Sequence, residues 1–98
     1  MALSIYWSKR ADQKFDGIIE YLQTKWSERI ARSFVRKTYE FLDLLLDYPE
    51  IGSVENKENG IRGYTIVKQV TVYYIIRDER IVLLNFFDNR QNPQQRKF

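Results

Sequence analysis

Residues 70–93 read VTVYYIIRDERIVLLNFFDNRQNP, and the rest of the chain is organised around them. Two runs of β-branched and aromatic residues flank the polar segment Asp78-Glu79-Arg80, which is the pattern of a β-hairpin with a tight turn. The second run ends in residues 88–93 (DNRQNP), so its strand carries an arginine and several amides to the rim of the sheet. We therefore predict a core hairpin, and we expect functional residues at that rim.

Alternation along residues 70–77 predicts that this strand has two different faces. One face is expected to pack against helices through Val70, Val72, Tyr74 and Ile76. The opposite face carries Thr71, Tyr73, Ile75 and Arg77. Because this second set is more polar, we expect Tyr73 and Arg77 to face solvent or a ligand.

Two other segments are typical of strands. Residues 61–67 (IRGYTIV) predict a strand joined to the hairpin by the short link Lys68-Gln69, and residues 3–7 (LSIYW) predict a strand at the edge of the sheet. Gly63 lies inside its strand, which indicates a bulge or a close backbone approach. The polar residues 53–60 predict a loop.

Between these segments the apolar period changes to that of a helix. A first amphipathic helix begins at Ala11, and its apolar face carries Phe15, Ile18, Ile19, Leu22 and Trp26. Gly17 weakens this helix by roughly 1 kcal/mol relative to Ala, and it indicates close approach to a neighbour.

A second, longer helix follows a cap at Ser27 and ends at Pro49 and Gly52. Its main apolar face carries Ile30, Phe34, Thr38, Phe41, Leu42 and Leu45. Because only residues 25–28 join the two helices, we predict an antiparallel helical hairpin that covers the sheet. Further apolar residues lie outside or at the margin of this face, and they form either a broad core face or a protein-binding surface: Val35, Tyr39, Leu44, Leu46 and Tyr48.

The composition limits what this chain can do. Its 98 residues are expected to form one domain spanning residues 1–98, because a chain this short has apolar sequence for one core. Without Cys or His, disulfides, thiol nucleophiles, imidazole bases and nearly all structural zinc sites are removed, so we expect no metal and no cofactor. No apolar run approaches the roughly 18–20 residues of a membrane helix, so we expect a cytoplasmic protein that does not bind membranes.

Positive charge is concentrated in the second half of the chain. Residues 1–50 contain eight basic and eight acidic side chains, whereas residues 51–98 contain eight basic and five acidic ones, which accounts for the net charge of +3. Residues 89–98 include Arg90, Arg96 and Lys97 and no acid. This end favours an anionic partner, and a solvated basic tail is the alternative interpretation.

The order of the predicted elements, β-α-α-β-β-β, resembles the RelE/ParE family of toxins from bacterial type II toxin-antitoxin pairs. This order describes an α+β fold in which a helical hairpin packs on one face of a small, mainly antiparallel, twisted sheet. Local features in the same order resemble the family as well: Trp7 and Ala11 with the spacing Phe15-Ile18-Ile19-Tyr21, the helix stop in Tyr48-Pro49-Glu50-Ile51-Gly52, Ile61-Arg62, Tyr73-Tyr74-Ile75-Ile76, and residues 87–93 (FDNRQNP). The resemblance covers nearly the whole chain.

The resemblance implies a toxin that is neutralised by a cognate antitoxin, with one of two targets. RelE-like members cut messenger RNA at the ribosome, and they use Arg and Lys to hold phosphate and usually a tyrosine near the carboxyl terminus. ParE-like members share the fold and act on DNA gyrase. No tyrosine follows Tyr74 in this chain, and only Phe98 lies near the expected place, so we favour the ParE-like function.

RNA cleavage without His requires a proton acceptor and cations that stabilise the charged transition state. Arg62, Lys68, Arg77 and Arg90 lie on or near adjacent predicted strands, so they are the candidates for such a cluster. As contacts to the target, whichever it is, we predict Arg62, Tyr73, Arg77 and Arg90. Arg90 is the strongest of these candidates, because it resembles the arginine that follows the family's last strand.

Two other functions remain open. A nonenzymatic nucleic-acid-binding module would use the basic rim to hold phosphate and exposed tyrosines to stack bases, although a net charge of +3 is modest for that role. A protein with the toxin fold that retains only partner binding is also compatible with the sequence.

Overall fold

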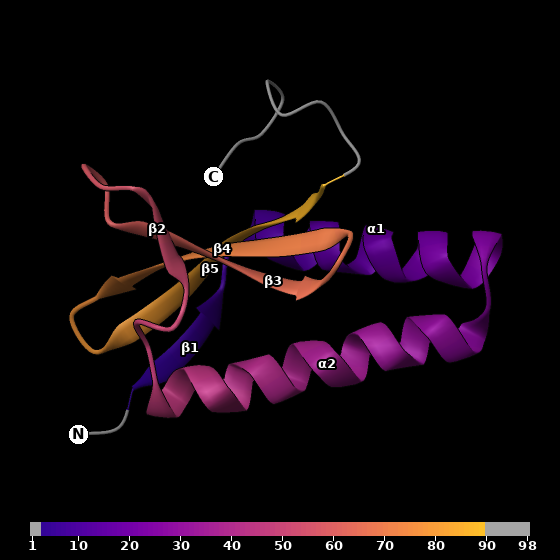
Figure 1. Ribbon diagram of the computed structural model, residues 1–98, viewed down its shortest axis with the longest axis horizontal. Coiled ribbons are helices and arrows are strands. Elements are labelled where there is room, and N and C mark those ends of the chain that lie inside the picture. Colours follow the sequence, from indigo (N-terminus) through magenta and orange to yellow (C-terminus); the bar gives the residue numbers. More distant parts are fainter. Residues whose placement is uncertain (1–2, 90–98) are drawn as a thin grey trace.

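The computed structural model describes residues 3–89, and it places the predicted hairpin in the middle of the sheet (Figure 1). Strands β4 (Val70–Arg77) and β5 (Arg80–Asp88) pair antiparallel across the two-residue turn Asp78-Glu79. Asp78 has a φ of 57°, and Asp is among the few non-glycine residues that tolerate this left-handed conformation in hairpin turns. The hairpin prediction is confirmed.

The sheet contains five strands in the order β1-β5-β4-β3-β2. β3 (Ile61–Val67) pairs antiparallel with β4, as predicted. β1 (Ser4–Trp7) lies parallel to β5 with Trp7 opposite Leu83, so the prediction of an edge strand at this end of the chain is confirmed. All other pairings are antiparallel.

The opposite edge corrects one prediction. Residues 53–60 are not entirely a loop, because β2 (Ser53–Asn56) pairs antiparallel with β3, with Val54 opposite Arg62. An edge strand needs only one row of backbone hydrogen bonds, and β2 packs no apolar face into the core, so its sequence lacks the usual alternation. The element order is therefore β-α-α-β-β-β-β, and the α+β class is confirmed.

Two capped helices form the predicted hairpin. The Ser8 hydroxyl accepts the N–H of Ala11 at 3.0 Å at the start of α1 (Lys9–Lys25), and Ser27 accepts the N–H of Ile30 at 3.1 Å at the start of α2 (Glu28–Asp47). At about 1.5 Å per residue the helices are about 26 and 30 Å long, and their joined ends extend past the β3–β4 turn (Figure 1). Neither helix in the described part of the chain is long and apolar enough to cross a membrane.

The helices cover one face of the sheet, as expected for residues 70–77. Val70, Val72 and Tyr74 are buried in the main core, against which Ile76 also packs. Aromatic rings dominate this core, since Trp7 stacks on Phe86 with ring centroids 5.5 Å apart and contacts Phe15 edge-on at 5.0 Å.

The other face of the sheet has a second, smaller apolar cluster of Ile61, Tyr73 and Phe87. Tyr73 is only 1% exposed, so the expectation that it faces solvent is wrong. Gly63 lies directly opposite Tyr73 in the sheet, and a Cβ at Gly63 would lie 3.0 Å from the ring. Because Gly63 has no side chain, the Tyr73 ring can pack directly against the backbone of β3, which confirms the close approach predicted at Gly63. The close approach predicted at Gly17 is wrong, because nothing lies within 4 Å of a Cβ built there.

The segment that follows α2 is fastened to the sheet by Tyr74 and Arg62. The Tyr74 hydroxyl accepts the N–H of Gly52 at 2.8 Å and donates to the carbonyl of Pro49 at 2.9 Å. Arg62 Nη1 donates to the carbonyls of Glu50 at 3.1 Å and Gly52 at 2.7 Å. These bonds, which we call the loop anchor, fix the position where the chain leaves α2 and enters β2.

Burial raises the pKa of Tyr74 above the usual 10.0, although the Gly52 hydrogen bond and the Arg62 charge act in the opposite direction. A raised pKa in the folded state means that folding favours the neutral hydroxyl. The stability that this group contributes is therefore complete below about pH 10 and is lost as the pH rises through the raised pKa.

Replacing Tyr74 with Phe is expected to lower the free energy of unfolding by about 1–3 kcal/mol, because the buried N–H of Gly52 loses its acceptor. Chemical denaturation measures this change. Tyr48→Phe is the matched control, because Tyr48 is 62% exposed, and it should change stability by less than about 0.5 kcal/mol. The unfolding free energy should also fall more steeply above about pH 10 in the wild type than in Tyr74→Phe. Equal stability of the two chains, or parallel pH curves, would contradict the loop anchor.

Candidate functional site

The basic residues predicted to form a phosphate cluster do not come together in the structure. Lys68 lies in the turn before β4 and Arg77 lies at the far end of that strand, so the length of an eight-residue strand, about 24 Å, separates them. Arg62 lies opposite Tyr74, whose ring faces the helices, and Arg62 belongs to the loop anchor. Arg77 alternates with Tyr73 and Ile75, so it belongs to the other face of the sheet. Arg90 lies outside the described residues.

A polar hollow of about 490 Å³ lies on the sheet beside β2, β3 and β4. Thr65, Thr71 and Asn89 form a hydrogen-bonded row along one side of it, with Asn89 Nδ2 donating to Thr71 Oγ1 at 2.9 Å. Among the described residues that line the hollow, Glu55 is the only charged one. Residues 3–89 therefore provide this hollow with no cation for a phosphate.

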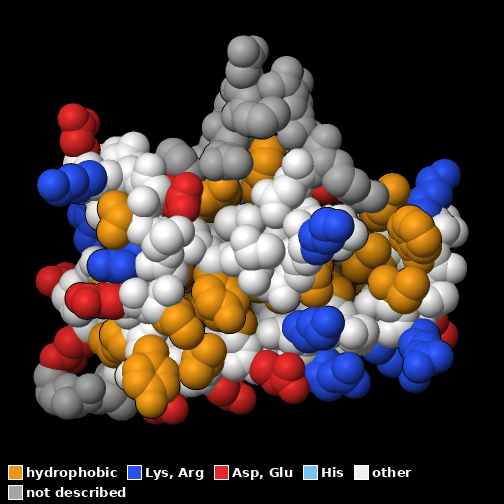
Figure 2. Space-filling view, in the orientation of Figure 1, with side chains coloured by type: hydrophobic (Ala, Val, Ile, Leu, Met, Phe, Trp, Pro, Cys, Tyr) orange, Lys and Arg blue, Asp and Glu red, His pale blue; other side chains and the backbone are white. Residues whose placement is uncertain are grey.

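A larger groove of about 670 Å³ opens where the helices extend past the sheet, between α1, α2 and the β3–β4 turn. We call it the apolar groove. Its floor and walls are mainly hydrophobic, with side chains from Ile18, Leu22, Trp26, Ile30, Phe34, Val67, Val70 and Phe86. Figure 2 shows hydrophobic side chains exposed at this end of the molecule, with Lys and Arg side chains around them.

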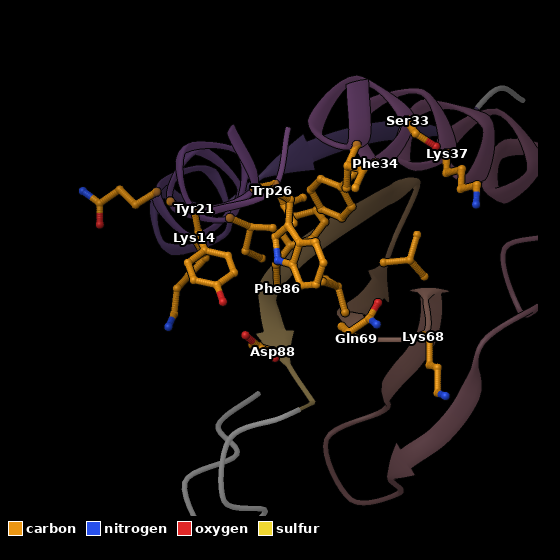
Figure 3. A pocket seen from close by; sticks show the side chains of 17 residues that line it. Lys14, Tyr21, Trp26, Ser33, Phe34, Lys37, Lys68, Gln69, Phe86 and Asp88 are labelled. Carbon is orange, nitrogen blue, oxygen red and sulfur yellow. The ribbon is translucent and has the colours of Figure 1, made fainter. Parts of the chain in front are cut away.

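Three lysines surround the apolar groove. In the close view Trp26 lies in the middle, with Lys14 and Tyr21 on one side and Lys37 and Lys68 on the other (Figure 3). Asp88 is the only acidic residue among those that line the groove in the described part of the chain. An apolar trough with a basic rim complements an amphipathic segment that carries acidic residues beside its apolar ones.

Sequence reasoning assigned Trp26 and Ile30 to the core, and the structure corrects both assignments. Trp26 is 63% exposed and Ile30 is 43% exposed, because the sheet ends before it reaches the helix junction. Trp26 and Ile30 continue the apolar periodicity of the buried residues, so no local sequence pattern distinguishes these two exposed residues from the buried ones. The one signal in the sequence is the length of the predicted helices, because helices longer than the strands that they cover must extend past the sheet.

The residues of the apolar surplus on α2 differ in their burial. Val35 packs against the main core, as a broad core face requires. Tyr39, Leu46 and Tyr48 are exposed, so they do not belong to the core face. In residues 3–89 no three carboxylates gather closely enough to hold a metal ion.

Comparisons with solved structures find this fold in bacterial toxins. The chromosomal ParDE toxin-antitoxin system from P. aeruginosa has a chain with a TM-score of 0.74 and 17% identity, over 88% of this chain and 95% of that one. A YoeB/ParE toxin from Agrobacterium tumefaciens gives a TM-score of 0.64 at 13% identity over 88% and 98% of the two chains. The YoeB dimer from Staphylococcus aureus gives a TM-score of 0.61 at 19% identity, over 85% of this chain and 92% of that one. At these identities the likeness shows the fold alone.

The sequence itself carries the family assignment. No curated protein matches this chain. The family model described as the ParE toxin of the type II toxin-antitoxin system parDE matches residues 5–93, which is nearly the whole chain and includes both helices, β2 to β5 and all of β1 except Ser4. The chain therefore belongs to the ParE toxin family of type II toxin-antitoxin systems.

Proposed function

We propose that this chain is a toxin that inhibits DNA gyrase and is neutralised by a cognate antitoxin. The observation that carries the choice of gyrase over messenger RNA is the scattering of the basic residues. Cleavage of RNA without His needs several cations around one phosphate, and Arg62, Lys68 and Arg77 lie on different faces or at opposite ends of the sheet. The absence of a tyrosine after Tyr74 supports the same choice.

The target contacts in this proposal are Arg77 and Arg90. Arg77 is exposed at the end of β4, directly opposite Arg80 on β5, whose guanidinium carbon lies 5.4 Å from the centre of the Tyr6 ring. Arg90 follows Asn89, the last described residue. Arg62 has a structural explanation in the loop anchor, and the buried ring of Tyr73 offers a target no surface.

The antitoxin is proposed to place an amphipathic segment in the apolar groove. Trp26 and Ile30 provide exposed apolar area there, and an aromatic residue in the centre of a contact usually dominates its binding energy. Lys14, Lys37 and Lys68 would meet acidic residues that flank the apolar positions of that segment. Covering the groove would bury apolar surface that the sheet leaves open.

The target is tested with purified protein in two parallel assays. We expect the chain to inhibit DNA supercoiling by gyrase and to leave messenger RNA intact on translating ribosomes, because Arg62, Lys68 and Arg77 do not lie around one phosphate. Electrophoresis of plasmid topoisomers and mapping of mRNA ends measure the two activities. Discrete cuts at the ribosomal A site would overturn the choice of gyrase, and harmless expression in bacteria would overturn the assignment as an active toxin.

Arg90→Ala is expected to abolish growth inhibition and to leave binding to the antitoxin unchanged, because Arg90 is assigned to the target and the apolar groove to the antitoxin. Growth of bacteria that express each variant, and affinity for the antitoxin, measure the two effects. Lys57→Ala is the control for loss of one exposed positive charge, since Lys57 lies in the turn between β2 and β3. Growth inhibition by Arg90→Ala at the wild-type level would contradict this site.

Trp26→Ser is expected to weaken binding to the antitoxin by at least about tenfold, since an interface Trp typically contributes about 2 kcal/mol or more. Isothermal titration calorimetry with the purified antitoxin measures the affinity. The matched control is Tyr48→Ser, because Tyr48 is 62% exposed and lies at the other end of α2. Equal affinities of Trp26→Ser and the wild type would show that the antitoxin binds elsewhere.

A further inference from the structure

The outward side of α2 carries charges in an unusual order. Arg32 and Arg36 lie in its amino-terminal half, and Asp43 and Asp47 lie in its carboxyl-terminal half. The last turn of α2 carries Asp47 and no basic residue, which is unfavourable at the negative end of the helix dipole, whereas Glu28 in the first turn suits the positive end. The dipole therefore does not explain why the bases and the acids of this side are separated along the helix.

These charged residues share one side of the helix. Together with Tyr39 and Glu40 they form what we call the outer stripe: Arg32, Arg36, Tyr39, Glu40, Asp43 and Asp47. At about 100° per residue the centre of the outer stripe lies roughly 180° around the helix from the buried residues Phe34, Thr38, Phe41 and Leu45. All six members are exposed. Figure 1 shows α2 along one border of the molecule, with both α1 and the sheet on its inner side.

Contacts within the chain do not account for this pattern. Arg32 forms an ion pair with Glu28 at 3.3 Å, but both side chains are largely exposed, and such pairs contribute little. Within residues 3–89 this is the only salt bridge on α2, so Arg36, Asp43 and Asp47 form none there. The charges of the outer stripe are therefore available to a partner.

The outer stripe is symmetric about the midpoint between Tyr39 and Glu40. Arg36 lies as far before that midpoint as Asp43 lies after it, and Arg32 and Asp47 are related in the same way. A two-fold axis through this midpoint would set two α2 helices antiparallel. Arg36 of each copy would then face Asp43 of the other, and Arg32 would face Asp47, so that four ion pairs form across the contact.

We propose that the outer stripe of α2 is a self-association surface, on which a second copy of this chain docks with its own α2 antiparallel. Tyr39 lies next to the axis and is 53% exposed, so the two tyrosine rings supply the apolar centre of the contact. Each ring already lies 6.5 Å from the ring of Trp7, between centroids, which limits the freedom lost when it is covered.

The proposed contact leaves the apolar groove open. The residues of α2 that line the groove are Ile30, Ser33, Phe34 and Lys37, and none of them belongs to the outer stripe. One chain can therefore bind an antitoxin segment on one side of α2 and a second copy on the other. The self-association does not depend on the identity of the toxin's target.

The test uses two single charge reversals in the full chain, Arg36→Asp and Asp43→Arg. Each reversal alone places like charges opposite each other at both symmetric positions, so each variant is expected to self-associate at least about tenfold more weakly than the wild type. Mixing the two variants in equal amounts creates a pair in which every acid again faces a base. The mixture should associate within about threefold of the wild-type affinity. Sedimentation velocity over a concentration series at about 50 mM salt measures all four samples, and higher salt should weaken the association.

A matched control reverses an exposed charge away from the outer stripe. Glu20→Lys on α1 should leave self-association unchanged, and circular dichroism should show that every variant is folded. Three results would overturn the proposal: a wild-type chain that stays monomeric, single variants that associate like the wild type, or a mixture no stronger than its components. The antitoxin affinities of the variants should equal that of the wild type, so failure of this proposal is distinct from failure of the groove.

Discussion

The structure depends on a mismatch in length between the helical hairpin and the sheet that it covers. Helices of 17 and 20 residues pack on strands of at most nine residues, and they extend past the β3–β4 turn. Over the sheet their apolar faces are buried among aromatic rings such as Phe15, Phe34 and Phe86. Beyond the sheet the same faces continue as the apolar groove, in which Trp26 and Ile30 stay exposed. The apolar faces of the two helices therefore form both the core and the surface that we assign to the antitoxin.

The opposite end of α2 is held firmly to the sheet. The loop anchor of Tyr74 and Arg62 uses two buried or half-buried side chains to bond the backbone of residues 49–52. Arg62 is occupied there, and Lys68 and Arg77 lie at opposite ends of β4, so the described sheet separates its cations. A toxin that works by binding a protein target has no need to bring them together, whereas a nuclease without His does.

Sequence patterns predicted the central hairpin, both helices, the Ser27 cap and the edge strand at residues 3–7, because each has a strong local signal. The strand β2 was missed because Ser53–Asn56 buries nothing and is paired only through its backbone. The burial of Tyr73 was missed because it depends on the space left by Gly63 on the neighbouring strand. The scattered positions of Arg62, Lys68 and Arg77 depend on register and strand length, which alternation within one strand does not reveal. The apolar groove likewise depends on where the sheet ends relative to the helices.

We assign the exposed end of the helical hairpin to the antitoxin. Hydrogen–deuterium exchange of this chain with and without its antitoxin tests that claim most directly, because it reports on every part of the backbone at once. We expect exchange to slow most in the carboxyl end of α1, the amino end of α2 and the β3–β4 turn, which together line the apolar groove. Protection confined to β1, β2 or the polar hollow, with unchanged exchange around Trp26 and Ile30, would contradict it.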